Sequence, residues 1–137
     1  MTKVNQIFVN LPVKDLNKSI EFFTKIGFTF NAQFTNENAT CMIIGENIFA
    51  MLLTEKYFST FITKEIADTK KTTELITSLL VNSREEVDAL LQKAFAAGGR
   101  QYKEPIDYDW MYNRNFEDLD GHQWEIFYMD MSAMPTE

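Results

Sequence analysis

The sequence predicts an α+β fold made of two copies of one βαβββ module, within one domain that spans residues 1–137. The order strand–helix–strand–strand–strand is found twice along the chain. The two halves keep a constant offset of 71 residues, which relates Asp15 to Glu86 and Gly27 to Gly98. The 12 Phe, 5 Tyr and 2 Trp supply apolar surface for a sizeable core. Together these features favour a duplicated globular domain over a disordered chain.

The first module is expected at about residues 4–54. Apolar runs and alternating residues between turn-forming residues predict its four strands, at about 6–11, 28–34, 39–44 and 48–54. The first strand is expected to end at Pro12, which cannot donate a hydrogen bond to a sheet. Asp15 then has the N-cap position of a helix, and Gly27 ends it because glycine readily adopts positive φ.

Residues 55–73 are expected to connect the modules. Tyr57, Phe58, Phe61 and Ile62 would form an apolar stripe if this segment is helical. We favour a role in covering the core or contacting another subunit over a role as a ligand lid. The lysine-rich remainder of the connector is predicted to be a solvated loop.

The second module is expected at about residues 74–131, followed by a tail at 132–137. Its predicted strands are about 75–82, 99–104, 110–117 and 122–130. The first of these is also compatible with a helix on periodicity alone. Ser83 and Glu86 form a capping box that begins a helix, and the Asp120-Gly121 pair predicts the last tight turn.

The formal charge of −7 limits the classes of binding partner that we expect. An acidic surface repels phosphate backbones, and the densest basic cluster (Lys64, Lys70 and Lys71) is diluted by acidic neighbours, so no nucleic acid is expected. No segment is apolar enough to span a bilayer, and the opening residues lack the pattern of a secretion signal. We therefore expect a cytoplasmic protein without a membrane partner.

Cys41 is the only cysteine and His122 the only histidine. A disulfide within the chain, a Cys-rich zinc site and any mechanism that needs two histidines are therefore excluded. Cys41 lies in an apolar run and is interpreted as a core residue. His122 follows the Asp-Gly turn and is interpreted as a residue that steadies the hairpin. Gly-rich phosphate loops and the G-x-S-x-G motif are absent from the sequence.

Two segments carry a family resemblance. FVNLPVKDLNKSIEFFTKIGF resembles the opening of the vicinal-oxygen-chelate superfamily, and FEDLDGHQWEIF resembles its last hairpin. The superfamily includes glyoxalase, bleomycin-resistance proteins, fosfomycin-resistance enzymes and extradiol dioxygenases, and the chain most resembles bacterial proteins described as lactoylglutathione lyase-like. The resemblance implies curled mixed sheets around a shared cavity. We also expect a homodimer, in which the modules pair within one chain or by exchange between two.

Metal-dependent members of this superfamily hold a divalent ion with side chains from the first and fourth strands of both modules. Carried over residue by residue, Glu125 matches the carboxylate of the last strand. The other three positions fall on Phe8, Ile76 and Leu52, the last with an uncertainty of one residue. His122 does not complete the set, because it would project to the face opposite Glu125. One carboxylate holds a divalent ion poorly, so no cofactor is expected, with a divalent metal as the alternative.

Strand alternation places the candidate ligand-binding side chains toward the cavity. These candidates are Phe8, Asn10, Leu52, Ile76, Ser78, Glu125 and Phe127. Arg114 is a further candidate, which either binds an anionic ligand or pairs with Glu117 or Asp118; the inward face of residues 110–116 is left open.

Glu125 is the one candidate for a catalytic residue, since a carboxylate among apolar side chains has a raised pKa unless it is paired. A structural or ligand-orienting role is favoured over catalysis. The predicted function is that of a glyoxalase/bleomycin-resistance-like protein that binds a small, partly apolar molecule without metal. The alternative is a metal-dependent lyase or dioxygenase of the same superfamily.

Overall fold

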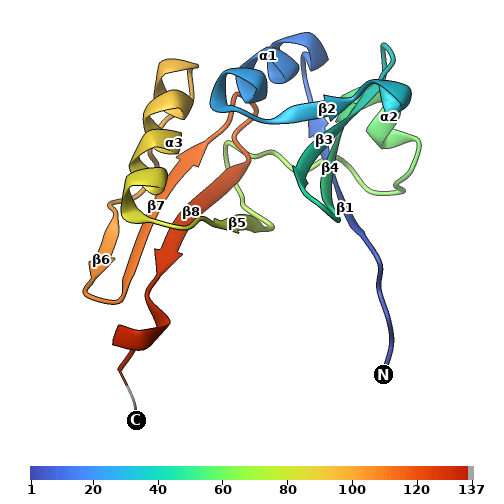
Figure 1. The fold of residues 1–137 in the computed structure, drawn as a ribbon. Helices are drawn as coiled ribbons and strands as arrows, with labels where there is room; N and C mark the ends of the chain where they lie inside the picture. Colours follow the sequence, from blue (N-terminus) through green and yellow to red (C-terminus); the bar gives the residue numbers. More distant parts are fainter. Residues whose placement is uncertain (136–137) are drawn as a thin grey trace. The chain divides into compact units, whose positions relative to one another are not determined.

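The computed structural model describes residues 1–135 and contains two compact units, Met1–Ile66 and Ala67–Glu137. Each unit holds one four-stranded sheet with both parallel and antiparallel pairs. In each unit a long helix follows the first strand of the sheet (Figure 1). This architecture confirms the predicted α+β class and its two βαβββ modules. No helix within residues 1–135 is long and apolar enough to cross a membrane.

The sheet of the first unit has the strand order β1-β4-β3-β2, in which β1 is parallel to β4 and the other pairs are antiparallel. Its strands are β1 (Ile7–Val13), β2 (Thr29–Asn31), β3 (Ala39–Gly45) and β4 (Ile48–Thr54). Helix α1 (Leu16–Ile26) contacts β3 and β4, and the short helix α2 (Glu55–Ser59) contacts β1 and β4.

Helix α1 begins and ends where local chemistry predicts. The amide of Lys18 donates to the Asp15 side chain at 3.1 Å, and Gly27 ends the helix at a φ of 120°. A residue with a side chain adopts that φ only with strain, so glycine is the residue suited to the position. The buried face of α1 carries Phe22 and Phe23, whose rings meet edge to face.

Two strand boundaries of the first unit differ from the prediction. Strand β1 continues through Pro12 to Val13, because β1 is paired on one side only in this sheet and tolerates a residue without an N–H there. The predicted strand 28–34 is cut short at Asn31, and a 3-10 turn, η1 (Ala32–Phe34), follows. The Asn31 side chain accepts from the amide of Gln33, which closes that turn locally.

The sheet of the second unit has the order β5-β8-β7-β6, with β5 parallel to β8. Its elements are β5 (Ile76–Leu80), α3 (Arg84–Ala96), β6 (Ile106–Tyr108), β7 (Met111–Glu117), β8 (Gln123–Met129) and the short η2 (Met131–Ala133). Helix α3 lies against β7 and β8 (Figure 1). The expected tail 132–137 thus begins inside η2, and its last two residues, 136–137, lie outside the described part of the chain.

The capping box of α3 forms as predicted. The amide of Glu86 donates to the Ser83 hydroxyl at 3.1 Å, and the Glu86 carboxylate reaches back to the amide of Asn82 at 2.7 Å. The core beneath α3 combines apolar residues of the helix and of the two central strands. These are Val87, Leu91, Ala94, Phe116, Trp124 and Ile126.

The predicted strand at 99–104 is wrong. Only a single bridge between Arg100 and Glu117 forms there, and the edge strand of the sheet is the unpredicted β6. The Asn115 side chain explains the difference, because it accepts from the amides of Tyr102 and Lys103 and donates to the carbonyl of Lys103. A side chain thereby satisfies backbone groups that a strand would pair with another strand.

The connector, residues 55–73, belongs partly to the first unit and partly to the second. In the first unit, α2 covers only part of the predicted stripe, and the rings of Tyr57 and Phe61 meet edge to face while both stay exposed. In the second unit, the Thr69 hydroxyl donates to the carbonyl of Asp120. Gly121 has a φ of +82°, and a Cβ there would lie 2.7 Å from the Thr69 hydroxyl oxygen. The connector is therefore fixed on the last hairpin, and glycine is required at the contact.

Candidate functional site

One face of the second sheet carries four of the eight candidate residues. The register places Ile76, Ser78 and Leu80 of β5 beside Gln123, Glu125 and Phe127 of β8, in that order. Paired residues of adjacent strands project to the same side of a sheet. We call this side the open face and define it by Ile76, Ser78, Leu80, Glu125 and Phe127; the opposite side, covered by α3, is the helix face.

The five residues that define the open face are three apolar side chains and one polar pair. Ile76 is 48% exposed and Leu80 60% exposed. Between them, the Ser78 hydroxyl donates to Glu125 Oε1 at 2.8 Å. Because the serine serves one carboxylate oxygen, the second oxygen can accept a hydrogen bond from a bound molecule.

The register of β7 decides which of its residues share the open face. Asn113 is paired with Phe127 and Asn115 with Glu125, so both asparagines lie on that side. Arg114 lies on the helix face, where its guanidinium forms an ion pair with Asp88 of α3 at 2.9 Å. The predicted pair with Glu117 or Asp118 is therefore wrong, because Arg114 pairs with Asp88, and its predicted contact with an anionic ligand stays a prediction.

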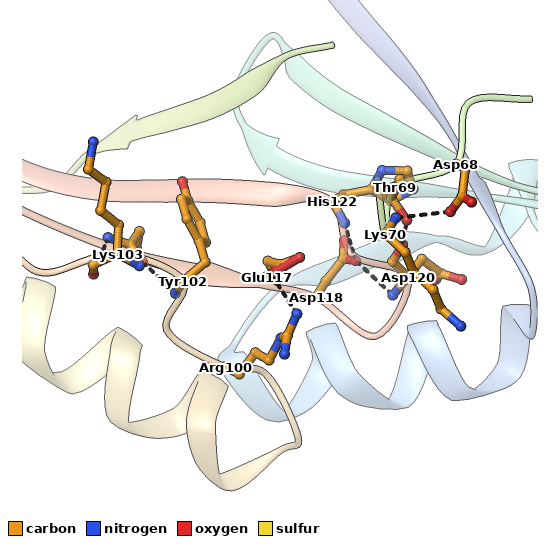
Figure 2. Close-up of polar contacts among 11 residues, drawn as sticks. Asp68, Thr69, Lys70, Arg100, Tyr102, Lys103, Glu117, Asp118, Asp120 and His122 are labelled. Carbon is orange, nitrogen blue, oxygen red and sulfur yellow. Dashed lines mark hydrogen bonds and ion pairs between the residues drawn. The ribbon is translucent and has the colours of Figure 1, made fainter. Parts of the chain in front are cut away.

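Tyr102 lies beside β7, where its amide donates to the Asn115 side chain at 3.0 Å, and the sequence analysis did not single it out. The charges of Glu125 and Glu117 act on its phenol, and burial with these charges raises the pKa of Tyr102 to about 12. Within residues 1–135, the Tyr102 hydroxyl is one of two buried side-chain atoms without a hydrogen-bond partner; the other is Nε of Arg114. Figure 2 shows Tyr102 on the segment that also carries Arg100 and Lys103. No pattern in the sequence marks this residue, because its position depends on Asn115.

In the first unit, Phe8 and Asn10 project to the exposed side of β1. Phe8 is 44% exposed and its ring stacks on Phe49, with 4.7 Å between the ring centroids. Asn10 is paired with Met51. The two candidates of this unit on β1 thus share one face with residues of β4.

Leu52 does not share that face. It is paired with Leu11, and both side chains are buried in the core. A step of one residue along a strand reverses the direction of the side chain. Met51 therefore takes the position next to Asn10 that the sequence analysis gave to Leu52, within the uncertainty of one residue stated there.

A separate pocket of about 570 Å³ lies in the second unit, between residues 69–73 and the 117–123 hairpin. Arg100 forms an ion pair with Glu117 at 3.0 Å at this place (Figure 2). Cationic and acidic side chains both line the pocket, so its charge favours no class of ligand.

Asp118 organises the hairpin beside this pocket. Its carboxylate accepts from the amides of Asp120 and His122 (Figure 2). It also accepts, at 3.0 Å, from the indole N–H of Trp124. Burial raises the pKa of Asp118, and the nearby His122 opposes that rise. These contacts support the interpretation of His122 as a residue of the turn.

Comparison with known proteins identifies similar sequences and structures. A family model described as bleomycin resistance protein-like N-terminal matches residues 6–45. A hypothetical protein from S. aureus has 31% sequence identity, with 93% of this chain and 95% of that chain covered and a TM-score of 0.78. A glyoxalase/bleomycin resistance protein/dioxygenase family enzyme from Burkholderia phytofirmans is similar over 90% of this chain and 97% of its own, with 16% identity and a TM-score of 0.74. The chain therefore has the fold of the glyoxalase/bleomycin-resistance proteins, and its residues 6–45 match the bleomycin resistance protein-like N-terminal family.

Proteins that share this fold include one that binds an antibiotic. An antibiotic binding protein from Streptomyces is similar over 95% of this chain and 99% of its own, with 18% identity and a TM-score of 0.66. At this identity the likeness shows the fold alone. Comparison with curated proteins gives no match.

The divalent ion of metal-dependent superfamily members does not fit the residues present here. The Glu125 carboxylate accepts a hydrogen bond from the Ser78 hydroxyl. The neighbouring position predicted for a metal ligand on the open face is occupied by the hydrocarbon side chain of Ile76. Within residues 1–135, no three His, Cys, Asp or Glu side chains are grouped so that they could hold a metal ion. Carboxylate and imidazole donors are what such an ion requires.

Proposed function

We propose that this chain is a member of the vicinal-oxygen-chelate superfamily that binds a small, partly apolar molecule on the open face, without a metal ion. The observation that carries the proposal is the exposure of Ile76 and Leu80 on either side of the Ser78–Glu125 pair. Small-molecule sites combine apolar walls with a few placed polar groups in this way. The predicted contribution of Phe8 and Asn10, and the cavity shared by both modules, stay predictions.

In this proposal Glu125 orients the ligand. Its carboxylate accepts from Ser78 through one oxygen and offers the other to an N–H or O–H of the bound molecule. The alternative is that Glu125 acts as an acid/base. In that case the protein would convert the bound molecule to a product, whereas a ligand-orienting role requires binding only.

A thermal-shift screen tests the binding. The probes are a set of small, partly apolar aromatic compounds, each with a hydrogen-bond donor that the Glu125 carboxylate can accept from. A ligand at a hundred times its Kd stabilises the folded chain by about 2.7 kcal/mol, which raises the Tm. We expect Glu125→Gln to reduce the shift and Glu74→Gln, at an exposed position, to leave it unchanged. A panel in which no compound raises the Tm contradicts the proposal.

The competing function is a metal-dependent lyase or dioxygenase, which superfamily membership supports and the donor set does not. Elemental analysis of protein purified without chelator separates the two. We expect no stoichiometric metal. One tightly bound Zn, Ni, Mn or Fe per chain, lost in Glu125→Gln and kept in Glu74→Gln, would establish the competing function.

We also propose a cytoplasmic homodimer. The support is the duplicated module, whose two copies can pair within one chain or between chains, and the single buried cysteine, which requires no oxidising compartment. Sedimentation velocity at micromolar concentration measures the assembly. A strict monomer contradicts the dimer and leaves the binding proposal unaffected.

A further inference from the structure

We propose that the ligand of the open face is a small organic ammonium ion with an elongated apolar body. Its ammonium group donates to the Glu125 carboxylate, and its body lies along the strands on the side of Leu80 and Phe127. The inference rests on the proposed function and adds the charge of the ligand and the direction in which it lies.

The ammonium group is placed by one row of residues across the sheet. Ser78 is the register partner of Glu125, and Glu125 that of Asn115. The Ser78 hydroxyl donates to Glu125 Oε1 at 2.8 Å, whereas the Asn115 side chain bonds to the backbone of residues 102 and 103. Glu125 is half-buried rather than enclosed, so a ligand can reach its Oε2 from solvent.

The charges on this side of the sheet favour a cation. Among the strand residues that the structure describes, the register places two charged side chains there, Glu125 and Glu117, and no lysine or arginine. Glu117 is 8% exposed and is paired with Arg100 at 3.0 Å. Glu125 is bonded only to a neutral hydroxyl. An ammonium group can therefore give it a charge-assisted hydrogen bond, whereas an anion would be repelled.

Apolar side chains lie in one direction from Glu125 along the strands. In the other direction, Ile76 shares its row with the polar side chains of Gln123 and Glu117. Towards the end of β8, the register groups Leu80 with Phe127, Met129 with Met111, and the neighbouring residues Ile106 and Tyr108 of β6 with these rows. Leu80, Ile106 and Tyr108 are exposed. An apolar body is therefore accommodated on the side of Leu80.

The strand spacing sets the length of that body. Side chains on one face of a strand follow each other at about 7 Å, so Phe127 lies one such step and Met129 two steps from Glu125. A body of about 7–13 Å covers these rows. The thioether side chains of Met111 and Met129 are unbranched, and they adapt to bodies of different shape.

The experiment compares probes that share one body and differ in the charge of the head. Phenylbutylamine, phenylbutanol and phenylbutanoate are a cation, a neutral donor and an anion at neutral pH. Methylamine supplies the cationic head without the body. Each is titrated into the ¹⁵N-labelled full chain, and the amide shifts of β5 and β8 report binding at the open face.

Two variants test the two ends of the ligand. Glu125→Gln removes the charge, and its matched control is Glu85→Gln, at an exposed position on α3. Leu80→Ala removes apolar contact, and its matched control is Leu119→Ala, at a position 45% exposed in the hairpin between β7 and β8. Ile76→Ala tests the opposite direction of the body. Thermal unfolding of each variant without ligand shows that it is folded.

We expect phenylbutylamine to bind at least tenfold more tightly than phenylbutanol and methylamine, with phenylbutanoate the weakest of the three phenylbutyl probes. Glu125→Gln should weaken binding of the amine about tenfold, because a charge-assisted hydrogen bond becomes a neutral one, and should change that of the alcohol little. Leu80→Ala should weaken amine binding about fivefold, and Ile76→Ala by less. Both control variants should bind the amine as the unchanged chain does.

The outcomes separate this inference from the proposed function. If no probe shifts β5 or β8 and the thermal-shift panel also yields no ligand, the proposed function fails. If the panel yields a ligand but the amine does not bind, or if the alcohol or the acid binds as tightly as the amine, only the cationic ligand is overturned. Equal losses in Glu125→Gln and Glu85→Gln also overturn it, since they would indicate attraction to the acidic surface in general. A loss in Ile76→Ala as large as in Leu80→Ala overturns the direction of the body.

Discussion

The two faces of the second sheet are built from the same strands and differ in how their side chains are satisfied. On the helix face, Phe116 and Trp124 stack and are fully buried, and the polar Tyr112 and Arg114 both bond to Asp88. On the open face, Ile76 and Leu80 of β5 stay exposed.

The difference separates stability from recognition. Packing and the bonds to Asp88 on the helix face hold α3 to the sheet, while apolar side chains of the open face stay exposed and can contact a ligand. Such local departures from a fully satisfied structure are expected where a protein binds its ligand. Each prediction below therefore concerns residues whose type is matched and whose surroundings differ.

The largest expected difference concerns two leucines. Leu91 of α3 is 0% exposed, whereas Leu80 is 60% exposed on the open face. Leu91→Ala should lower the free energy of unfolding by about 2–5 kcal/mol, because it leaves a cavity in the core. Leu80→Ala should change it by about 0.5 kcal/mol or less. Urea denaturation measures both, and equal losses would contradict the distinction between the faces.

A smaller effect is expected from the polar cluster of the helix face. The hydrogen bond from Tyr112 and the charge-assisted bond from Arg114 hold the pKa of Asp88 below its usual value of 3.8. The stabilisation by this group is therefore present at neutral pH and is lost as the pH falls through that lowered pKa.

Asp88→Asn should cost about 1 kcal/mol at neutral pH and should reduce the loss of stability in acid. Half-exposure of the Asp88 side chain limits the effect, because solvent screens its charge. Chemical denaturation at neutral and acidic pH measures both changes, with Glu74→Gln as the exposed control. An acid profile identical to that of the unchanged chain would show that Asp88 does not contribute.

The smallest effect concerns Tyr102 in alkali. Its pKa is raised from 10 to about 12, so the folded chain keeps a proton that the unfolded chain loses between these values. Stability should fall as the pH rises through this range, since the native state binds more protons. Tyr102→Phe should unfold at slightly higher pH than the unchanged chain. Alkaline titration followed by circular dichroism measures the midpoint, and a lower midpoint for the variant contradicts the prediction.

The helices were predictable because their end signals are local. Asp15 and Gly27 bound α1, and Ser83 with Glu86 begins α3, through contacts within four residues. The shared face of Ile76, Ser78 and Glu125 was equally predictable, because side chains alternate between the two faces of a strand once the position of the strand is known.

The sequence analysis failed where the face or the partner of a side chain depends on the strand register or on a residue far along the chain. Leu52 was assigned to the face of Phe8, but pairing with Leu11 places it in the core. Arg114 was considered with its neighbours along β7, whereas its partner Asp88 lies 26 residues away on α3. A sequence pattern contains neither fact, because both depend on which element packs against which.

The sequence alone determined the order of elements, the two modules and the carboxylate at residue 125, because capping, alternation and turn chemistry act between neighbours along the chain. Only the tertiary structure decided that the Asn115 side chain, rather than a strand at 99–104, pairs with the backbone of Tyr102 and Lys103. The physical reason is that buried backbone groups take whichever partner the fold brings within reach, and a side chain 12 or 13 residues away serves them as well as a strand.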